Sequence, residues 1–304
     1  ATPAAFGFLT PDPASIQVGS PSFRILQVPD GETLSLVGGT INVGTPDDPA
    51  TVLVDESAPG FLLAPSGGRV NLVSVASPGE ATINSAINTD GFTELGDINI
   101  SGGSLIDGRD VYIRSGQLAI DDAIVWPGVF SLFGLGPPPD GGEVNVKVRN
   151  DFTITGTAPD PFIGLAWPGI FTFAGDLFDI PTVATKVPDI TIQTDTLSLA
   201  GVASVQNLRA GPGMPGDVTI NADRVRAEDG AYIGALNFYE GFGGNVLIDA
   251  NQMDLVGEFS GLFVQGLLNF FALCFCDPGL TFADSGAITL NEARSEEHTS
   301  ELQS

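Results

Sequence analysis

Residues 107–114 are the part of the chain whose side chains are best suited to acid–base chemistry. Asp107 and Asp110 lie within a few positions of Arg109 and Arg114. Carboxylates beside a basic partner are the groups that cleave acidic polysaccharides. Strand alternation through this segment, however, places Asp110, Tyr112 and Arg114 on one solvent-facing side and leaves Asp107 in a turn. We therefore predict no enzymatic activity and keep a polysaccharide lyase or hydrolase as the alternative.

Other residues that could bind metals or act as nucleophiles are few. The acidic pairs at 47–48 and 121–122 could supply carboxylates to a divalent ion, but acidic pairs on turns are usually solvated. Cys274 and Cys276 are two small buried thiols or a strained disulfide, and zinc would need further ligands. The G-x-G-x-x-G match at 211–216 contains two prolines and precedes a strand, which predicts a loop. We expect no metal ion and no cofactor.

Two aromatic segments suggest a binding surface. The motif Trp-Pro-Gly occurs at 126–128 and again 41 residues later, at 167–169, each time between predicted strands. Inserts at one corner of a repeat protein stack on one side, so their aromatic side chains would form a ledge. Such a ledge could stack on sugar rings or contact a partner protein, or it could pack onto the scaffold, which we favour. The candidate ligand-binding residues are Trp126, Phe130, Trp167, Phe171, Phe238 and Tyr239.

An internal repeat organises these segments. Each copy has a Gly or Pro, an often polar residue, an apolar-polar-apolar triplet and a polar turn. Ile190, Val218 and Val246 begin three triplets spaced by 28 residues, and looser copies begin at 98, 144 and 288. The 46-residue and 42-residue gaps on either side are interpreted as the same unit with insertions. Such periodicity is typical of solenoids.

The repeat predicts an all-β fold. Period-2 alternation makes each triplet a strand with one face inward. Asp195, Asp223 and Asn251 occupy equivalent positions, where an Asx side chain can bond its own backbone and turn the chain. Short strands and corners with no helical period favour a parallel β-helix, a single-stranded solenoid of about ten to thirteen coils with aromatic-rich loop insertions. A β-sandwich is the alternative.

Four segments resemble a known family. They are FGFL at 6–9, LSLVGG at 34–39, GGRVNLVSVASPGE at 67–80, which is the most specific, and SGGSLI at 101–106. They are similar to the filamentous haemagglutinin group of bacterial exoproteins secreted by the two-partner route, with repeats of the cyanobacterial type. The resemblance covers nearly the whole chain.

The resemblance implies a right-handed parallel β-helix, a pectin lyase-like fold. It also implies export through an outer-membrane two-partner secretion transporter, a secreted or cell-surface location, and a role in adhesion through glycan or protein contacts. The Asn-Pro-Asn type secretion motif of that family does not occur in this sequence, so transporter recognition is assigned to no residue.

Charge and composition restrict the partners. The formal charge of −26 opposes binding to nucleic acids and to anionic membrane surfaces. The longest apolar stretch, 262–276, is shorter than the roughly 20 residues of a membrane-spanning helix. We expect residues 1–293 to form one domain, an internal fragment of a larger exoprotein. Residues 294–304, which contain the one histidine, back-translate to a common sequencing-library adapter and are interpreted as an artefactual tail.

Overall fold

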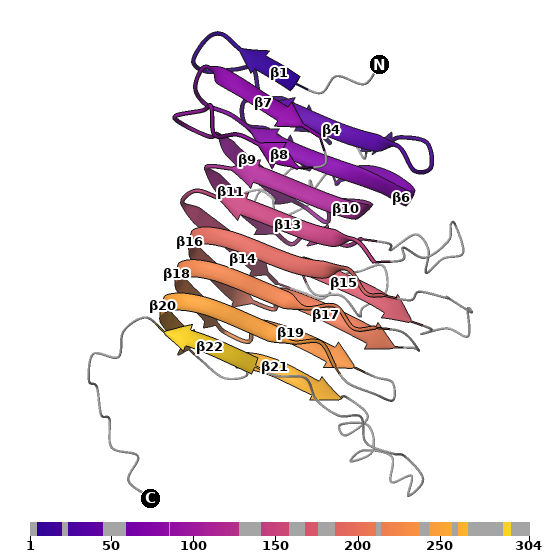
Figure 1. The fold of residues 1–304 in the computed structure, drawn as a ribbon, viewed down its shortest axis with the longest axis vertical. Coiled ribbons are helices and arrows are strands. Elements are labelled where there is room, and N and C mark those ends of the chain that lie inside the picture. Colours follow the sequence, from indigo (N-terminus) through magenta and orange to yellow (C-terminus); the bar gives the residue numbers. More distant parts are fainter. Residues whose placement is uncertain are drawn as a thin grey trace, which may run out of the picture.

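The structure is a computed structural model in which strands lie side by side along one long stack (Figure 1). It describes residues 5–19, 24–44, 59–84, 86–127, 141–157, 168–175, 186–210, 214–237, 243–256, 261–266 and 288–292. These residues contain strands and no helix, so the predicted all-β class is confirmed. Cys274, Cys276 and the proposed tail at 294–304 lie outside the described residues.

Most strands belong to one large parallel sheet that forms three ladders. Ladder I contains β4 (Thr33–Gly38), β13 (Glu143–Val148), β22 (Ile288–Glu292) and parts of the long strands β6 (Gly60–Ser74), β10 (Leu105–Ser115), β16 (Asp189–Gly201), β18 (Val218–Glu228) and β20 (Val246–Val256).

Ladder II contains β2 (Ile16–Val18), β5 (Ile41–Val43), β9 (Asp97–Ser101), β11 (Gln117–Asp121), β14 (Asp151–Gly156) and the second halves of β16, β18 and β20. Ladder III contains β3 (Arg24–Gln27), β12 (Ile124–Val125), β15 (Gly169–Gly175), β17 (Ser204–Ala210), β19 (Tyr232–Asn237), β21 (Gly261–Gly266) and the first halves of β6 and β10. On each round the chain passes through ladders II, III and I in that order, and every pairing within them is parallel.

The predicted repeat register is confirmed in ladder I. Val144 is the partner of Ile190, which pairs with Val218, then Val246, then Ile288. The looser copy beginning at Ile98 was assigned wrongly, because Ile98 pairs with Ile41 and Leu118 in ladder II. All three ladders use the same apolar-polar-apolar alternation, so the pattern cannot identify the ladder to which a triplet belongs.

The described residues also contain fewer rounds than the number of coils predicted for the chain. The strands named above give eight to each ladder within the described part of the chain, against ten to thirteen predicted coils. Residues 75–96 leave the stack between β6 and β9, and further residues separate β12 from β13 and β15 from β16. The segment 75–96 lengthens the chain without adding a rung, and composition alone does not reveal it.

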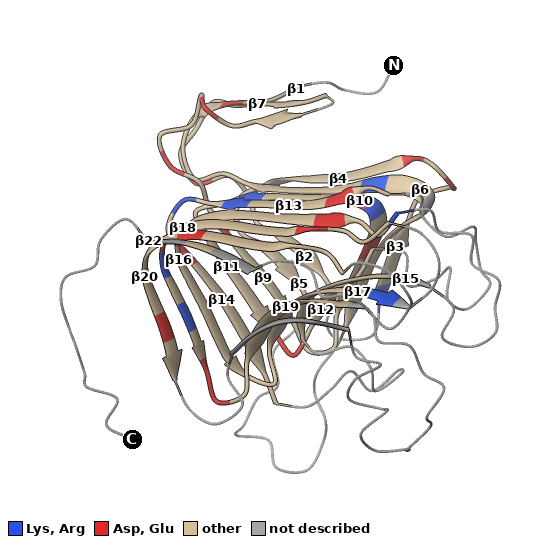
Figure 2. Cartoon of the chain, turned by 60° about the horizontal axis from the view of Figure 1, so that its bottom comes forward, with Lys and Arg blue, Asp and Glu red and all other residues tan. Residues whose placement is uncertain are grey.

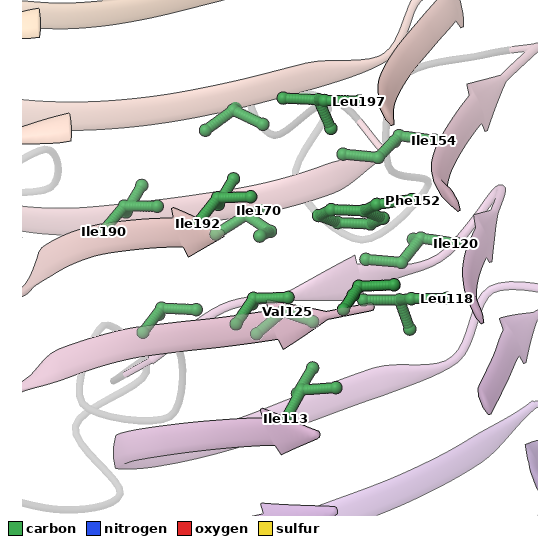
Figure 3. Packing of buried hydrophobic residues seen from close by; sticks show 14 of the residues in the cluster. Ile113, Leu118, Ile120, Val125, Phe152, Ile154, Ile170, Ile190, Ile192 and Leu197 are labelled. Carbon is green, nitrogen blue, oxygen red and sulfur yellow. The ribbon is translucent and has the colours of Figure 1, made fainter. Parts of the chain in front are cut away.

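The core fills the space between the ladders. It is formed by the inward-facing residues of all three, many of them fully buried, including Ile113, Phe152 and Ile192 (Figure 3). Phe152 of ladder II pairs with Leu118 on one side and Leu197 on the other. Each such side chain contributes about 1.5–3 kcal/mol through burial. The alternation therefore produces one continuous apolar column along the stack.

Polar residues hold neighbouring rungs together at two corners. The Asp189 carboxylate accepts a bond from the Asp217 amide at 2.9 Å, and Asp217 accepts one from the Asn245 amide at 2.8 Å, each 28 residues further along. At the other corner Asn251 Nδ2 donates to Asp223 Oδ1 at 3.1 Å. This bond runs to the next round, whereas the sequence predicted a bond from the side chain to its own backbone.

A small antiparallel sheet, here called the flap, lies over the outer side of ladder I (Figure 2). It consists of β1 (Ala5–Phe8), β7 (Gly79–Ile83) and β8 (Ile87–Asn88). Its base is closed where the Gly96 amide bonds to the Ser74 carbonyl at 3.1 Å. A second apolar cluster lies beneath it, formed by Val73, Val75, Ala81, Ile87, Phe92 and Tyr112. The flap was not predicted.

We expect Arg149→Ala to loosen the flap. The Arg149 guanidinium donates to the Thr93 and Phe92 carbonyls, both at 2.8 Å, and so connects the β13–β14 corner to the returning flap segment. Losing both bonds should lower the local opening free energy by about 1–2 kcal/mol. Hydrogen exchange of the flap amides should accelerate while that of the core strands stays unchanged. Lys147→Ala, which removes an exposed cation from β13, is the control; equal exchange in both variants would contradict this role.

Candidate functional site

The residues considered for acid–base chemistry all lie on β10, but they do not form a solvent-exposed face. Val111 and Ile113 are fully buried in the core, so Asp110, Tyr112 and Arg114 do share the outer side. Tyr112 and Arg114 nevertheless expose only 9% and 5% of their surface, which corrects the predicted solvent-facing position. For Tyr112 the reason is the flap, because the apolar cluster beneath it includes this residue. Asp107, predicted in a turn, is a buried strand residue before the bulge at 108–110.

The carboxylates of this cluster are occupied by neighbouring protein groups. Asp110 forms an ion pair with Arg109 at 2.7 Å and accepts the Glu143 amide at 3.2 Å. Glu143 in turn accepts hydrogen bonds from the Tyr112 hydroxyl and from Asn145 Nδ2. This arrangement joins β10 to β13, and it gives each carboxylate a structural partner.

The Tyr112 ring lies against two cations. The Arg69 guanidinium is 3.8 Å from the ring centroid and that of Arg114 is 5.8 Å away. Arg114 donates to the Ile113 and Asn145 carbonyls, both at 2.8 Å. Burial lowers the pKa of Arg114 to about 10, so its guanidinium remains charged at neutral pH. The cation–π contacts and the two carbonyls compensate for its lost hydration.

We expect the Tyr112 hydroxyl to ionise at a higher pH than that of an ordinary tyrosine. Burial, followed by the hydrogen bond to Glu143, raises the pKa of Tyr112 to about 12. The fold favours the neutral phenol, so this stabilisation is complete below pH 10 and is lost as the pH rises through about 12. The lowered pKa of Arg114 acts in the opposite direction over the same range, so global stability is a poor readout. Tyrosinate absorbance compared between the wild type and Tyr112→Phe measures Tyr112 directly; a difference spectrum that titrates near pH 10 would contradict the prediction.

The other predicted metal and nucleophile candidates do not form a site in the described residues. Asp122 accepts the amide and hydroxyl of Thr157 at 2.7 and 2.8 Å, and Asp121 accepts the Thr155 hydroxyl. These bonds join β11 to the end of β14. Within the described ranges no group of three or more His, Cys, Asp or Glu side chains could hold a metal ion. The pair at 47–48 lies outside them.

Two of the predicted aromatic binding residues meet in ladder III, but both are buried. Trp126 and Phe171 expose 2% and 1% of their surface and pack edge to face, with ring centroids 4.6 Å apart. Because Val125 pairs with Ile170, Trp126 is level with Phe171, and the repeated Trp-Pro-Gly motif does not mark equivalent positions. Burial is what the packing alternative requires. Phe130, Trp167, Phe238 and Tyr239 lie outside the described residues, so the ledge as a whole stays a prediction.

A groove that sequence reasoning missed lies on the outer side of ladder II. Its volume is about 290 Å³, and it is lined by Gln17, Asn42, Gly44, Asn99, Ile100, Ser101, Ala119 and Asp121. Gln17 is the partner of Asn42, which pairs with Asn99, and Asn99 pairs with Ala119. Four successive strands therefore each contribute one outward residue to the same row.

Small residues create the hollow and amides form its walls. Ala119 has a shorter side chain than its partners on the two adjacent strands, Asn99 and Thr153, so it leaves a gap in the row. Gly44 has φ of +81°, and a Cβ there would collide with the Ser101 carbonyl and the Ser104 hydroxyl. Only glycine fits this bend.

Hydrogen bonds between strands fix the polar side chains of the groove. Asn99 Nδ2 donates to Asn42 Oδ1 at 2.9 Å, and Gln17 Nε2 donates to the Gly44 carbonyl at 2.9 Å. Asp121, the one ionisable lining residue, is held by Thr155. An amide bonded through one of its groups can still present the other to a ligand. The groove therefore offers oriented, mostly uncharged donors and acceptors.

No protein-family model, curated protein or solved structure matches this chain. In the part of the chain that the structure describes, no helix is long and apolar enough to cross a membrane.

Proposed function

We propose that this chain is part of a secreted bacterial surface protein of the filamentous haemagglutinin type that acts in adhesion by binding glycan or protein ligands. Its architecture would be a right-handed parallel β-helix with one strand per side in each round. Two-partner export through an outer-membrane transporter and residence outside the cell belong to the same proposal. The support is the confirmed 28-residue register of ladder I and the constant order of the ladders.

The observation that carries the binding role is the groove on ladder II. The groove is open and lined by amide side chains from successive strands. The pairing of those strands sets the spacing between the side chains. Amides and a carboxylate are suited to sugar hydroxyls, which act as both donors and acceptors. The net charge of −26 favours uncharged ligands over anionic ones and opposes nucleic acids.

The enzymatic alternative has less support from the described residues. Asp110, one of its predicted residues, and Glu143 beside it are bonded to neighbouring protein groups, and Tyr112 and Arg114 are buried. A catalytic acid or base must instead reach the substrate. We therefore propose binding without turnover.

A glycan array probed with the purified chain tests the proposal. We expect retention of particular glycans, with no shortened products after incubation with the same glycans or with polyuronates. Fluorescent beads coated with the chain should adhere to cells that display a retained glycan, and soluble glycan should compete. Absence of both glycan binding and cell adhesion would contradict the proposed function, and turnover abolished by Asp110→Ala would support the enzyme.

A further inference from the structure

The groove is part of a longer uncharged row of side chains on ladder II. The outward residues of successive strands follow the register Gln17, Asn42, Asn99, Ala119, Thr153 and Ser198. All of them are at least partly exposed. Six rungs correspond to a track on the order of 24 Å at the spacing of neighbouring strands.

The track ends where the face becomes charged. Ser198 is followed by Arg226 and then Asp254. Both belong to ion pairs, Arg226 with Glu228 and Asp254 with Arg224, each at 2.5 Å. In Figure 2 these charges appear on the second halves of β18 and β20. The uncharged character of the track is thus limited to the rungs from β2 to β16.

A ligand on this face must be recognised through side chains. Within the ladder the backbone groups of neighbouring strands pair with one another, so a peptide cannot be added as a further strand on the outer face. The row offers amides and hydroxyls, and Asp121 is the one ionisable residue that lines the groove. These groups suit a ligand rich in hydroxyls and free of charge, since an anion would meet the Asp121 carboxylate and the acidic chain.

The periodicity of the track points to a periodic ligand. Asn42 and Asn99 present the same side chain one rung apart, and an amide–amide bond holds them in a common orientation. Neighbouring strands are about 4.8 Å apart, close to the length of one pyranose unit in an extended chain. We propose that the groove binds an uncharged linear polysaccharide lying along the stack, about one sugar to each rung. This inference rests on the proposed glycan binding and names its ligand class and direction.

Calorimetry with oligosaccharides of increasing length tests the inference. The probes are neutral cello-, manno- and xylo-oligosaccharides of one to six sugars, with oligogalacturonates of equal length. We expect the affinity for one neutral series to rise about tenfold or more between one and four sugars and then level off. It should change little with ionic strength, and the uronates should bind more weakly.

Asn99→Ala supplies the site-specific arm, with Asn221→Ala as the matched control. Asn221 is an exposed outward residue of ladder I, away from the groove. We expect about tenfold weaker binding of the longer oligomers in Asn99→Ala, and an unchanged affinity in Asn221→Ala, at equal melting temperatures. Length-independent binding, preference for uronates, or glycan binding insensitive to Asn99→Ala would overturn the inference and leave the proposed adhesion intact. If no glycan binds on the array or in solution, the inference fails, and the proposed function fails with it only if the coated beads also do not adhere to cells.

Discussion

Phe152→Ala is expected to lower the free energy of unfolding by about 3–5 kcal/mol. Phe152 is fully buried between Leu118 and Leu197 of the adjoining rungs of ladder II. Its removal leaves a cavity that two flanking strands, held in register by their pairing, cannot close. Chemical denaturation followed by circular dichroism measures the change.

Thr153→Ala is the matched control for the Phe152 prediction. Thr153 is the next residue of β14 but faces outward and is exposed, so its substitution should change the unfolding free energy by no more than about 0.5 kcal/mol. Equal, small effects of the two substitutions would contradict the inward and outward assignment of β14, and with it the assigned core.

Trp126→Ala is expected to cost a similar amount, about 3–5 kcal/mol, with a large fall in the melting temperature. Trp126 is buried against Phe171, and its Nε1 is buried without a hydrogen-bond partner. The indole therefore contributes through packing and its edge-to-face contact, not through a polar bond. Trp126→Phe, which keeps an aromatic ring and removes the unpaired N–H, should retain most of the stability.

The same substitution separates the two roles considered for the aromatic segments. If Trp126 only packs, glycan binding by the folded fraction of Trp126→Ala should equal that of the wild type below its melting temperature. A double-mutant cycle with Phe171→Ala should give a coupling energy of about 0.5–1.5 kcal/mol. Binding lost at an unchanged melting temperature would instead identify Trp126 as a recognition residue and contradict the packing role.

The sequence predicted the strands of ladder I well because that part of the chain repeats without interruption. Ile190, Val218 and Val246 are separated by the same interval of 28 residues, and each triplet stacks on its predicted partner. The three ladders could not be separated in the same way, since Ile98 and Val144 begin similar triplets yet belong to different ladders. Alternation specifies which side chains face inward but not which side of the stack a strand occupies.

The groove and the flap depend on contacts that no local pattern encodes. Asn42 and Asn99 are 57 residues apart, and the intervening chain includes the flap segment. Their pairing follows only once residues 75–96 are known to leave the stack. The burial of Tyr112 has the same origin, because the alternation correctly placed it outward but could not anticipate the flap above it. The sequence pattern therefore predicts the all-β class and the register of ladder I, but not the surface on which we propose that ligands bind.

The binding of a neutral oligosaccharide to Ala119→Trp, measured beside the wild type and Ala119→Ser, tests the central claim most directly. Ala119 lines the groove and points away from the core, so an indole there should fill the hollow without disturbing the ladders. We expect Ala119→Trp to lose at least about tenfold in affinity at an unchanged melting temperature, while Ala119→Ser stays close to the wild type. Wild-type affinity in a folded Ala119→Trp would contradict the assignment of the ladder II groove as the binding site.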